Sequence, residues 1–481
     1  MRKSTSHIFS VLRSRSSLLK FLGICLVTYG CLKSQSKAFS DENISEFKSG
    51  EPFQPSRGGA ILHMFDHSFI EIMRRLPEIS SLGYDYIQIS PAQLSRGDME
   101  WWGRYQPLDY RIIDGPLGTE KDLKRLIDEA ARAGVGIIAD LVLNHAGNLG
   151  NNYHLTYPPK WVREKYKVGV LFDSSHFKDP FCITNFDDRY QLLNGRLCNL
   201  ADPEDGGLPD YDIFQEYVFN VHKTYVKKLI DLGIAGFRID ALKHMEESYF
   251  PRLLSDFKDR NLLIFGEVIA DRNSYDRNLG PYLRTTDMRL MDFPYQKTMV
   301  DAFKINADLR LLLSTNNSKR TLPRERSVEF VTNHDIPNNG GTFAHLILDP
   351  TDELLANIYM FARKGGIPHM YTDRGVVGRL KSDRWLEFYR KPLMKNALRF
   401  YTKVFKEGQT VVDASKCFIA LKRGSKGLAA INKCGEQKEF ILERSFSKDA
   451  KDLISGNVIS AGLRNQTVKI PARGAVLYLV E

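Results

Sequence analysis

The sequence predicts a (β/α)8 TIM barrel with a small domain inserted after its third strand and a C-terminal antiparallel β-sandwich. Eight short apolar runs alternate with helical patterns, one connection is very long, and short, closely spaced strands follow residue 380. An open doubly wound sheet is the alternative. The apolar runs are Ala60–Phe65, Tyr86–Ser90, Gly136–Leu143, Gly236–Asp240, Leu262–Glu267, Leu290–Phe293, Val328–Thr332 and Ile367–Tyr371.

Amphipathic stretches lie between several of these runs. In Glu120–Ala133 the apolar residues recur at helical spacing, and Phe214–Leu232 is a second such stretch. Gly233 follows it where a helix C-cap is expected. Strands buried on both faces, each followed by a crossover helix, form parallel sheets, and eight such units favour a closed barrel.

The connection after the third run is too long for a simple loop. Its residues are rich in Asn, Asp, Tyr and Pro and show little helical periodicity, which favours a small irregular domain. The predicted organisation is a leader at 1–40, a linker at 41–57, two parts of the barrel at 58–143 and 208–380, the inserted domain at 144–207, and the sandwich at 381–481.

The net charge of +10 comes mainly from the leader. Residues 1–40 hold seven basic residues and no acid, so the remainder carries +3, which argues against a nucleic-acid partner. The apolar run Phe21–Leu32 is short for a membrane span, and Ala38-Phe39-Ser40 offers a cleavage site. We therefore expect an exported (secreted or periplasmic) monomer without stable membrane insertion once the leader is removed. Lipoprotein anchoring at Cys31 and an uncleaved or organelle-targeting leader stay open.

Four cysteines follow the leader, in two local pairs without zinc-type spacing. An oxidising compartment favours the disulfides Cys182–Cys198 and Cys417–Cys434, and four free buried thiols are the alternative.

Acidic residues end three of the apolar runs, where a barrel places its active site. Asp240 ends the fourth run, Glu267 the fifth, and Asp335 follows the seventh. Arg238 lies on the same strand face as Asp240 and favours its ionised form, whereas repulsion by Asp240 would raise the pKa of Glu267. One ionised and one protonated carboxyl are what retaining glycoside cleavage requires.

Each acid alone is weak evidence, because an acid at a strand end is more often the N-cap of the next helix. The combination is more specific. Together these segments resemble the four signature regions of the α-amylase family, glycoside hydrolase family 13, and are closest in character to the animal-type enzymes: Asp140–His145, Gly236–His244, Phe265–Val268 and Val331–Asp335.

The resemblance implies roles for matching residues. Asp240 would be the nucleophile, Glu267 the acid/base and Asp335 the transition-state stabiliser. The substrate, an α-1,4-linked glucan such as starch, glycogen or a maltodextrin, would be cut internally. It would contact Trp102, Tyr105, Gln106, His145, Arg238, Lys243, His244 and His334, whereas Trp101 is equally well explained as core.

The resemblance also implies a calcium ion. Its ligands would be Asn144, Asp210 and the main-chain carbonyl of His244. Chloride is not expected, because the third position of the family's anion site is His369 rather than a clearly basic residue, although Arg238 and Asn333 match.

Two other functions stay open at this stage. An exo-acting or transglycosylating member of the same family would have the same signature regions. A silent glucan-binding barrel is disfavoured, because all three catalytic carboxylates are present.

Overall fold

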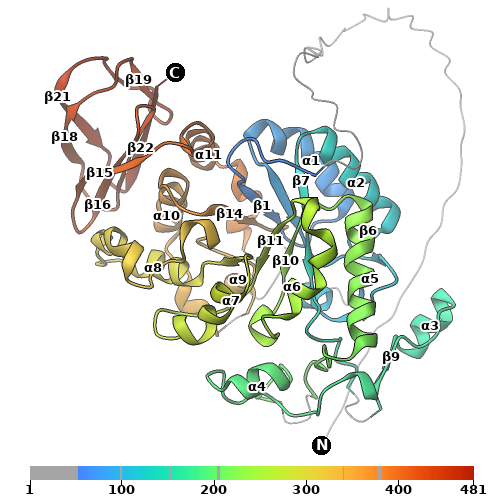
Figure 1. Ribbon diagram of the computed structural model, residues 1–481. Coiled ribbons are helices and arrows are strands. Elements are labelled where there is room, and N and C mark those ends of the chain that lie inside the picture. Colours follow the sequence, from blue (N-terminus) through green and yellow to red (C-terminus); the bar gives the residue numbers. More distant parts are fainter. Residues whose placement is uncertain are drawn as a thin grey trace, which may run out of the picture. The chain divides into compact units, whose positions relative to one another are not determined.

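The computed structural model describes residues 52–97, 100–150, 154–202, 206–339, 341–375 and 382–480 (Figure 1). The predicted leader, its cleavage site and Cys31 lie outside these residues.

Eight parallel strands form a closed barrel, so the predicted fold class is confirmed and the open sheet is wrong. The first strand pairs with both the second and the last, which closes the ring. The strand order is β1-β14-β13-β12-β11-β10-β7-β2. Their bounds are β1 Ile61–Met64, β2 Tyr86–Ile89, β7 Gly136–Leu141, β10 Gly236–Ile239, β11 Leu263–Gly266, β12 Arg289–Met291, β13 Ser327–Glu329 and β14 Ile367–Thr372.

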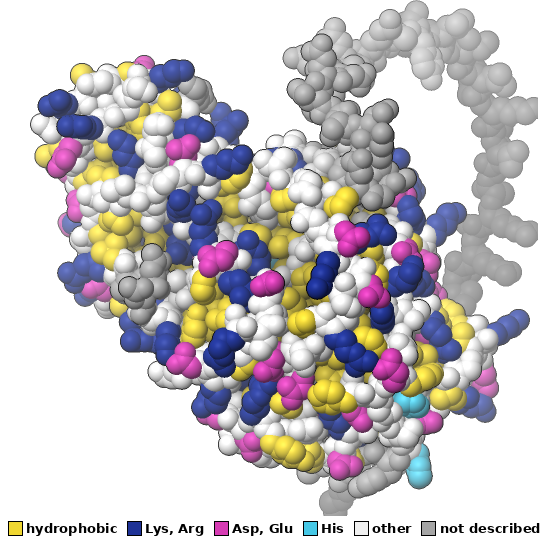
Figure 2. All heavy atoms as spheres, viewed as in Figure 1, with side chains coloured by type: hydrophobic (Ala, Val, Ile, Leu, Met, Phe, Trp, Pro, Cys, Tyr) yellow, Lys and Arg dark blue, Asp and Glu magenta, His cyan; other side chains and the backbone are white. Residues whose placement is uncertain are grey.

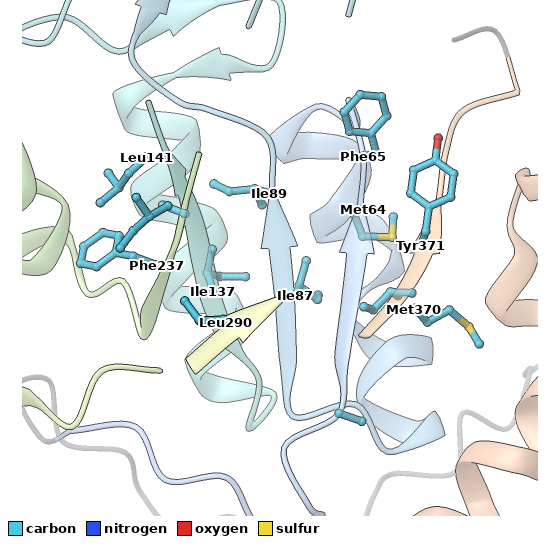
Figure 3. Close-up of a cluster of buried hydrophobic side chains, with 14 of the residues drawn as sticks. Met64, Phe65, Ile87, Ile89, Ile137, Leu141, Phe237, Leu290, Met370 and Tyr371 are labelled. Carbon is cyan, nitrogen blue, oxygen red and sulfur yellow. The ribbon is translucent and has the colours of Figure 1, made fainter. Parts of the chain in front are cut away.

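Alternate residues of each strand face opposite sides of the barrel wall. One set packs against the surrounding helices, and Figure 3 shows part of it, including Ile87 and Ile89 of β2 with Ile137 of β7. The other set forms a separate apolar cluster that includes Ile138 and Phe265. The strands are buried on both sides, which explains their continuous apolar runs.

Helices around the barrel begin and end at recognisable caps. In α2, Glu120–Arg132, the N-cap Thr119 and Asp122 form a reciprocal capping box. The helix α5, Glu216–Leu232, ends at Gly233, whose φ of 102° confirms the predicted C-cap. The other helices of the barrel region are α1 Phe69–Leu82, α6 Tyr249–Leu253, α7 Gly280–Thr285, α8 Phe293–Phe303, α9 Asp335–Asn338 and α10 Pro350–Ala362.

The long connection between β7 and α5 contains short elements joined by irregular chain. These are β8 Thr156–Tyr157, α3 Lys160–Tyr166, β9 Phe172–Asp173 and α4 Arg189–Asn194. The disulfide Cys182–Cys198 closes the segment around α4, with 5.6 Å between the Cα atoms. The expected disulfide is present, and the alternative of free thiols is wrong here.

The C-terminal part begins with a helix rather than a strand. The segment predicted as sandwich from residue 381 forms two short 3-10 helices, Asp383–Trp385 and Phe388–Arg390, and then α11, Pro392–Val404, whose apolar face belongs to the main core. The strands follow as β15 Gln409–Ala414, β16 Phe418–Arg423, β17 Gly427–Asn432, β18 Lys438–Arg444, β19 Ala450–Asp452, β20 Val458–Ile459, β21 Arg464–Ile470 and β22 Gly474–Val480.

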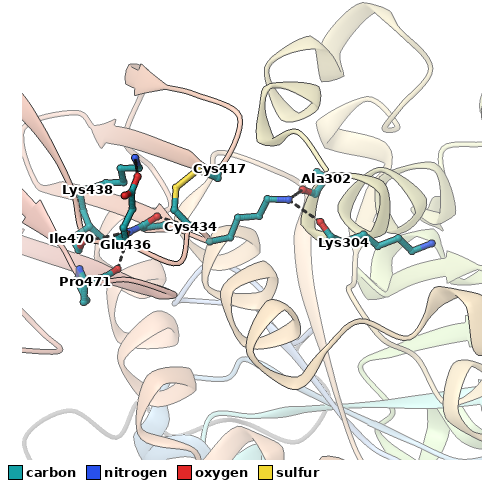
Figure 4. Close-up of a disulfide and its surroundings, with 10 residues drawn as sticks. Ala302, Lys304, Cys417, Cys434, Glu436, Lys438, Ile470 and Pro471 are labelled. Atoms are coloured by element: carbon teal, nitrogen blue, oxygen red, sulfur yellow. Dashed lines mark hydrogen bonds and ion pairs between the residues drawn. A yellow bond between two sulfur atoms is a disulfide. The ribbon is translucent and has the colours of Figure 1, made fainter. Parts of the chain in front are cut away.

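Two antiparallel sheets make up the sandwich. One has six strands, in the order β15-β16-β17-β22-β19-β20, and the other pairs β18 with β21. Side chains from both sheets share one apolar core. The disulfide Cys417–Cys434 links the residue before β16 to the turn that follows β17 (Figure 4). Beside it, Lys433 donates hydrogen bonds to the carbonyls of Ala302 and Lys304 at 2.8 and 2.9 Å, which ties the sandwich to the end of α8.

In the part of the chain that the structure describes, no helix has the length and apolar content needed to cross a bilayer.

Candidate active site

One buried arginine holds three carboxylates at the carboxyl ends of the strands. The Nη1 atom of Arg238 lies 2.8 Å from Oδ1 of Asp140 and 2.7 Å from Oδ1 of Asp240. Its Nη2 atom lies 2.7 Å from Oε1 of Glu267. The expected pairing of Arg238 with Asp240 is present, but the same guanidinium also contacts two other acids.

The strand register brings these residues together. Arg238 on β10 lies beside Asp140 on β7 and Phe265 on β11. Because side chains alternate along a strand, Asp240 faces the same side as Arg238, and Glu267 the same side as Phe265. The side chains of these four residues, from three neighbouring strands, therefore converge at the carboxyl end of the barrel.

Asp335 reaches the site from a loop. The seventh strand ends at Glu329, so the predicted strand to Thr332 was too long, and Asp335 instead begins the short helix α9. Its Oδ1 accepts a hydrogen bond of 2.7 Å from Asn339 and lies 3.6 Å from Nε2 of His334. A side-chain hydrogen bond links Asp335 to Glu267, so the three predicted acids lie in one cluster.

Burial, reinforced by the neighbouring acids, favours a protonated Glu267. Burial raises its pKa to about 8; Arg238 opposes the shift, and the charges of Asp335 and Asp240 reinforce it. Burial likewise raises the pKa of Asp335 to about 6. The predicted direction for Glu267 is therefore found, but burial rather than repulsion by Asp240 is its largest cause.

Aromatic rings line one side of the cluster. The ring of Tyr105 stacks on that of His334, with centroids 5.2 Å apart, and its hydroxyl donates to Oδ2 of Asp140 at 3.0 Å. The Nε2 atom of His145 lies 3.0 Å from the carbonyl oxygen of Tyr105. Trp101 is almost buried and packs against both Tyr105 and His334, so it supports this wall from behind.

Two of the predicted sugar contacts lie next to this wall. Trp102 is partly exposed, and the guanidinium carbon of Arg96 lies 5.3 Å from its ring centre. Gln106 accepts a hydrogen bond of 2.9 Å from the main-chain N–H of Asn148, which links the barrel to the start of the inserted domain. Among the described residues, neither side chain forms a hydrogen bond or ring contact with the carboxylate cluster.

Lys243 and His244 follow Asp240 on a short 3-10 helix, Leu242–His244. The Nζ atom of Lys243 lies 5.7 Å from the ring centre of Phe186, an exposed side chain of the inserted domain. The Nδ1 atom of His244 lies 3.0 Å from the carbonyl oxygen of Leu192 in α4. These two residues therefore connect the fourth strand to the inserted domain.

Asp210, one of the three residues expected to bind calcium, pairs with a lysine. Oδ2 of Asp210 lies 2.9 Å from the ammonium Nζ of Lys178. Asp210 is the only carboxylate among the three expected ligands, whereas calcium prefers six to eight oxygens including several charged ones. Among the described residues, no group of three or more His, Cys, Asp or Glu side chains is arranged to hold a metal. With its one carboxylate paired to an ammonium, this ligand set lacks the negative charge that calcium sites usually have.

Two of the residues compared with the family's chloride site, His369 and Asn333, are buried. Nε2 of His369 lies 2.8 Å from Oε1 of Gln88, and burial lowers the pKa of His369 to about 3. Oδ1 of Asn333 accepts a hydrogen bond from the N–H of Ile336. A neutral imidazole adds no positive charge beside Arg238, and independence from chloride stays a prediction.

Sequence reasoning missed two polar residues inside the barrel. Asp140 is fully buried and shares Arg238 with the two predicted acids, and burial raises its pKa to about 7. The ring of His63 lies 5.5 Å from that of His334 and 5.3 Å from that of His369. A charged or polar residue within an otherwise apolar strand was the signal available in both cases.

This geometry can now be compared with known proteins. The sequence model described as "Alpha amylase, catalytic domain" matches residues 67–374, well over half of the chain. The chain belongs to the α-amylase family. It is therefore a glycoside hydrolase that acts on α-glucans.

Curated relatives agree with this assignment over most of their length. The chain is 33% identical to an alpha-amylase of Aeromonas hydrophila over 440 residues, which covers 86% of this chain and 94% of the relative. It is 26% identical to an alpha-amylase-related protein of Drosophila elegans over 470 residues, covering 86% and 89%. The expected likeness to animal enzymes is thus found, alongside a stronger one to a bacterial enzyme.

Solved structures share the fold. Alpha-amylase I of Eisenia fetida superposes with a TM-score of 0.71 at 21% identity, covering 89% of this chain and 96% of that one. The alpha-amylase of Geobacillus thermoleovorans, solved with acarbose, gives 0.68 at 21% identity, covering 89% and 99%.

Proposed function

We propose that this α-amylase family member hydrolyses internal α-1,4-glucosidic bonds with retention, through a covalent glycosyl intermediate on Asp240. The observation that carries the proposal is the shared guanidinium: two nitrogens of Arg238 contact Asp240 and Glu267, each at 2.7 Å. Retaining enzymes need the two carboxyls about 5–5.5 Å apart, and contact with one guanidinium keeps this pair close.

Asp240 acts as the nucleophile. One oxygen of its carboxylate, Oδ1, pairs with Nη1 of Arg238 at 2.7 Å, which orients the group at the carboxyl end of the fourth strand. The carboxylate attacks the anomeric carbon of the bound glucose unit as the bond to the leaving oxygen breaks, forming the glycosyl ester.

Glu267 acts as the general acid and then the general base. Its raised pKa keeps the proton on the carboxyl at neutral pH, so it can protonate the leaving glycosidic oxygen. In the second half of the reaction the resulting carboxylate takes a proton from water, which attacks the glycosyl ester and releases Asp240.

The remaining cluster orients and distorts the sugar. Asp335 accepts hydrogen bonds from the sugar hydroxyls and His334 donates to them. Tyr105 packs a ring face against the pyranose. Arg238 and His145 complete the cleavage position. Neighbouring glucose units contact Trp102 and Gln106 on one side and Lys243 and His244 on the other.

The test is product analysis with the purified protein on amylose, maltotriose and pullulan. Rapid loss of amylose viscosity, mixed malto-oligosaccharides and α-anomeric products by early NMR are expected. A single short product released from chain ends would show exo action, and longer products than the substrate would show transglycosylation. No turnover on any of these glucans would contradict the proposal and favour a silent glucan-binding barrel.

We further propose that the enzyme works as an exported monomer without a nucleic-acid partner. The two disulfides and the basic, apolar leader sequence support export. On the face shown in Figure 2, Lys and Arg side chains are interspersed with Asp and Glu over the barrel rather than gathered in one basic stripe. Size-exclusion chromatography with light scattering tests whether the protein is a monomer in solution.

A further inference from the structure

A lysine lies where the inserted domain meets the barrel. Lys178 follows Phe177, which bridges to Tyr211 on the chain that returns to the barrel. Its main-chain N–H donates to the carbonyl of Asp210 at 2.9 Å. The side chain is 12% exposed and that of Asp210 is 2% exposed, so the pair is largely withdrawn from water.

The ammonium joins three separate segments. Nζ of Lys178 lies 2.9 Å from Oδ2 of Asp210 and donates a hydrogen bond to the carbonyl of Leu193 near the end of α4. The ring of His244, in the 3-10 helix that follows the fourth strand, lies 3.0 Å from the preceding carbonyl, that of Leu192. Asp210 in turn bridges to His145, directly after the third strand.

The local charge leaves little attraction for a divalent ion. Asp210 supplies the one negative charge among the expected ligands. The ammonium of Lys178 pairs with its Oδ2, whereas Oδ1 is buried without a hydrogen-bond partner among the described residues. A second cation, the buried Arg196, also interacts electrostatically with Asp210 and donates a hydrogen bond of 3.1 Å to the carbonyl of Gly206. An added calcium ion would meet two positive side chains around one carboxylate.

We infer that the ammonium of Lys178 is the built-in cation that fastens the inserted domain to the barrel, so that no calcium ion binds at Asp210. The ammonium offers three donors, and two of them are used by Asp210 and Leu193. It takes the place of the ion that the family resemblance implies. The inference does not depend on the proposed reaction, since it concerns stability and metal content rather than turnover.

The first experiment uses the unaltered full-length protein. Its melting temperature is measured in excess EDTA and in millimolar calcium, and its metal content is measured after desalting from calcium-containing buffer. We expect the same melting temperature in both conditions and less than one tenth of a calcium ion per chain. Bound calcium near one ion per chain, or a melting temperature several degrees lower in EDTA, would overturn the inference.

The second experiment replaces the lysine. Lys178→Met keeps the aliphatic length but leaves the carboxylate of Asp210 buried without its partner, so the melting temperature should fall by about 5 °C. Lys160→Met is the matched control, because Lys160 is an exposed lysine of the same inserted domain that pairs with the exposed Glu164 at 3.7 Å.

The two variants separate the possible outcomes. We expect Lys160→Met to melt like the unaltered protein and millimolar calcium to raise the melting temperature of Lys178→Met alone. A Lys178→Met variant as stable as the control would show that the ammonium fastens nothing, and this result would contradict the inference. If Lys178→Met does not fold, the metal content and the EDTA response of the unaltered protein still test whether calcium binds at Asp210.

Discussion

Two buried acids follow neighbouring strands of the barrel and have opposite surroundings. Asp292 comes directly after β12 and N-caps α8 by accepting from the N–H of Tyr295 at 2.8 Å. Its other oxygen accepts from the hydroxyls of Thr321 and Ser327 and from the N–H of Leu322, at 2.7–2.8 Å. Glu267, directly after β11, has Arg238 at 2.7 Å, the N–H of Ala241 at 3.3 Å and a side-chain hydrogen bond with Asp335.

The difference separates a structural acid from a reactive one. Both oxygens of Asp292 accept hydrogen bonds from neutral donors of the protein, so the carboxylate is held in place as an N-cap. Glu267 shares its one cation with Asp140 and Asp240. Its proton is therefore held by burial and by nearby like charges, and it can be given to a substrate. Position at a strand end does not distinguish the two; their hydrogen-bond partners do.

Asp240→Asn should have the largest effect on activity. The amide cannot form the glycosyl ester, so kcat should fall by at least about 10⁴-fold. The melting temperature should change little, because the amide oxygen can still accept from Arg238. Initial rates on amylose and a thermal melt measure both quantities, and a variant that keeps more than a tenth of the activity would refute the nucleophile assignment.

Glu267→Gln should lower kcat by about 10³-fold on starch, because the leaving oxygen is no longer protonated. In the unaltered enzyme the raised pKa of Glu267 predicts that kcat/KM falls as pH rises through about 8, since the carboxyl then loses its proton. The variant should lack this alkaline limb. An aryl maltoside with an acidic phenol leaving group should restore much of the first step, and equal losses on both substrates would contradict the acid role.

Asp292→Asn is the matched substitution at the structural acid. An amide nitrogen would face the donors Thr321, Leu322 and Ser327, so the free energy of unfolding should fall by about 2–3 kcal/mol. The kcat of the folded enzyme should stay within about twofold. Thermal melts and active-site-normalised rates test this contrast. A loss of kcat comparable to that of Asp240→Asn would remove the distinction between the two acids.

Trp102→Ala should have the smallest effect of this series. Losing a partly exposed ring face for a neighbouring glucose unit should raise KM about three- to tenfold with kcat nearly unchanged. Trp161→Ala is the control, because Trp161 is an exposed tryptophan on α3 of the inserted domain. Equal KM values for the two variants would place the substrate away from Trp102.

Local patterns in the sequence determined much of the barrel. The apolar runs located all eight strands, and helical spacing with Gly233 located α5 and its end. The acids at the ends of the fourth and fifth runs could be assigned to one rim because parallel strands share a common edge. These features depend on periods of two and 3.6 residues, which a single sequence displays directly.

Only the tertiary structure decided which charges meet. Arg238 and Asp140 are 98 residues apart, and they pair because β10 lies beside β7 in a register that sets Arg238 opposite Asp140. The contact between Lys178 and Asp210 likewise depends on the path of the inserted domain back to the barrel. A residue's type and spacing show what it can bind, but the free energy of a charge depends on its burial and on its neighbours in space, which strand register and chain path determine.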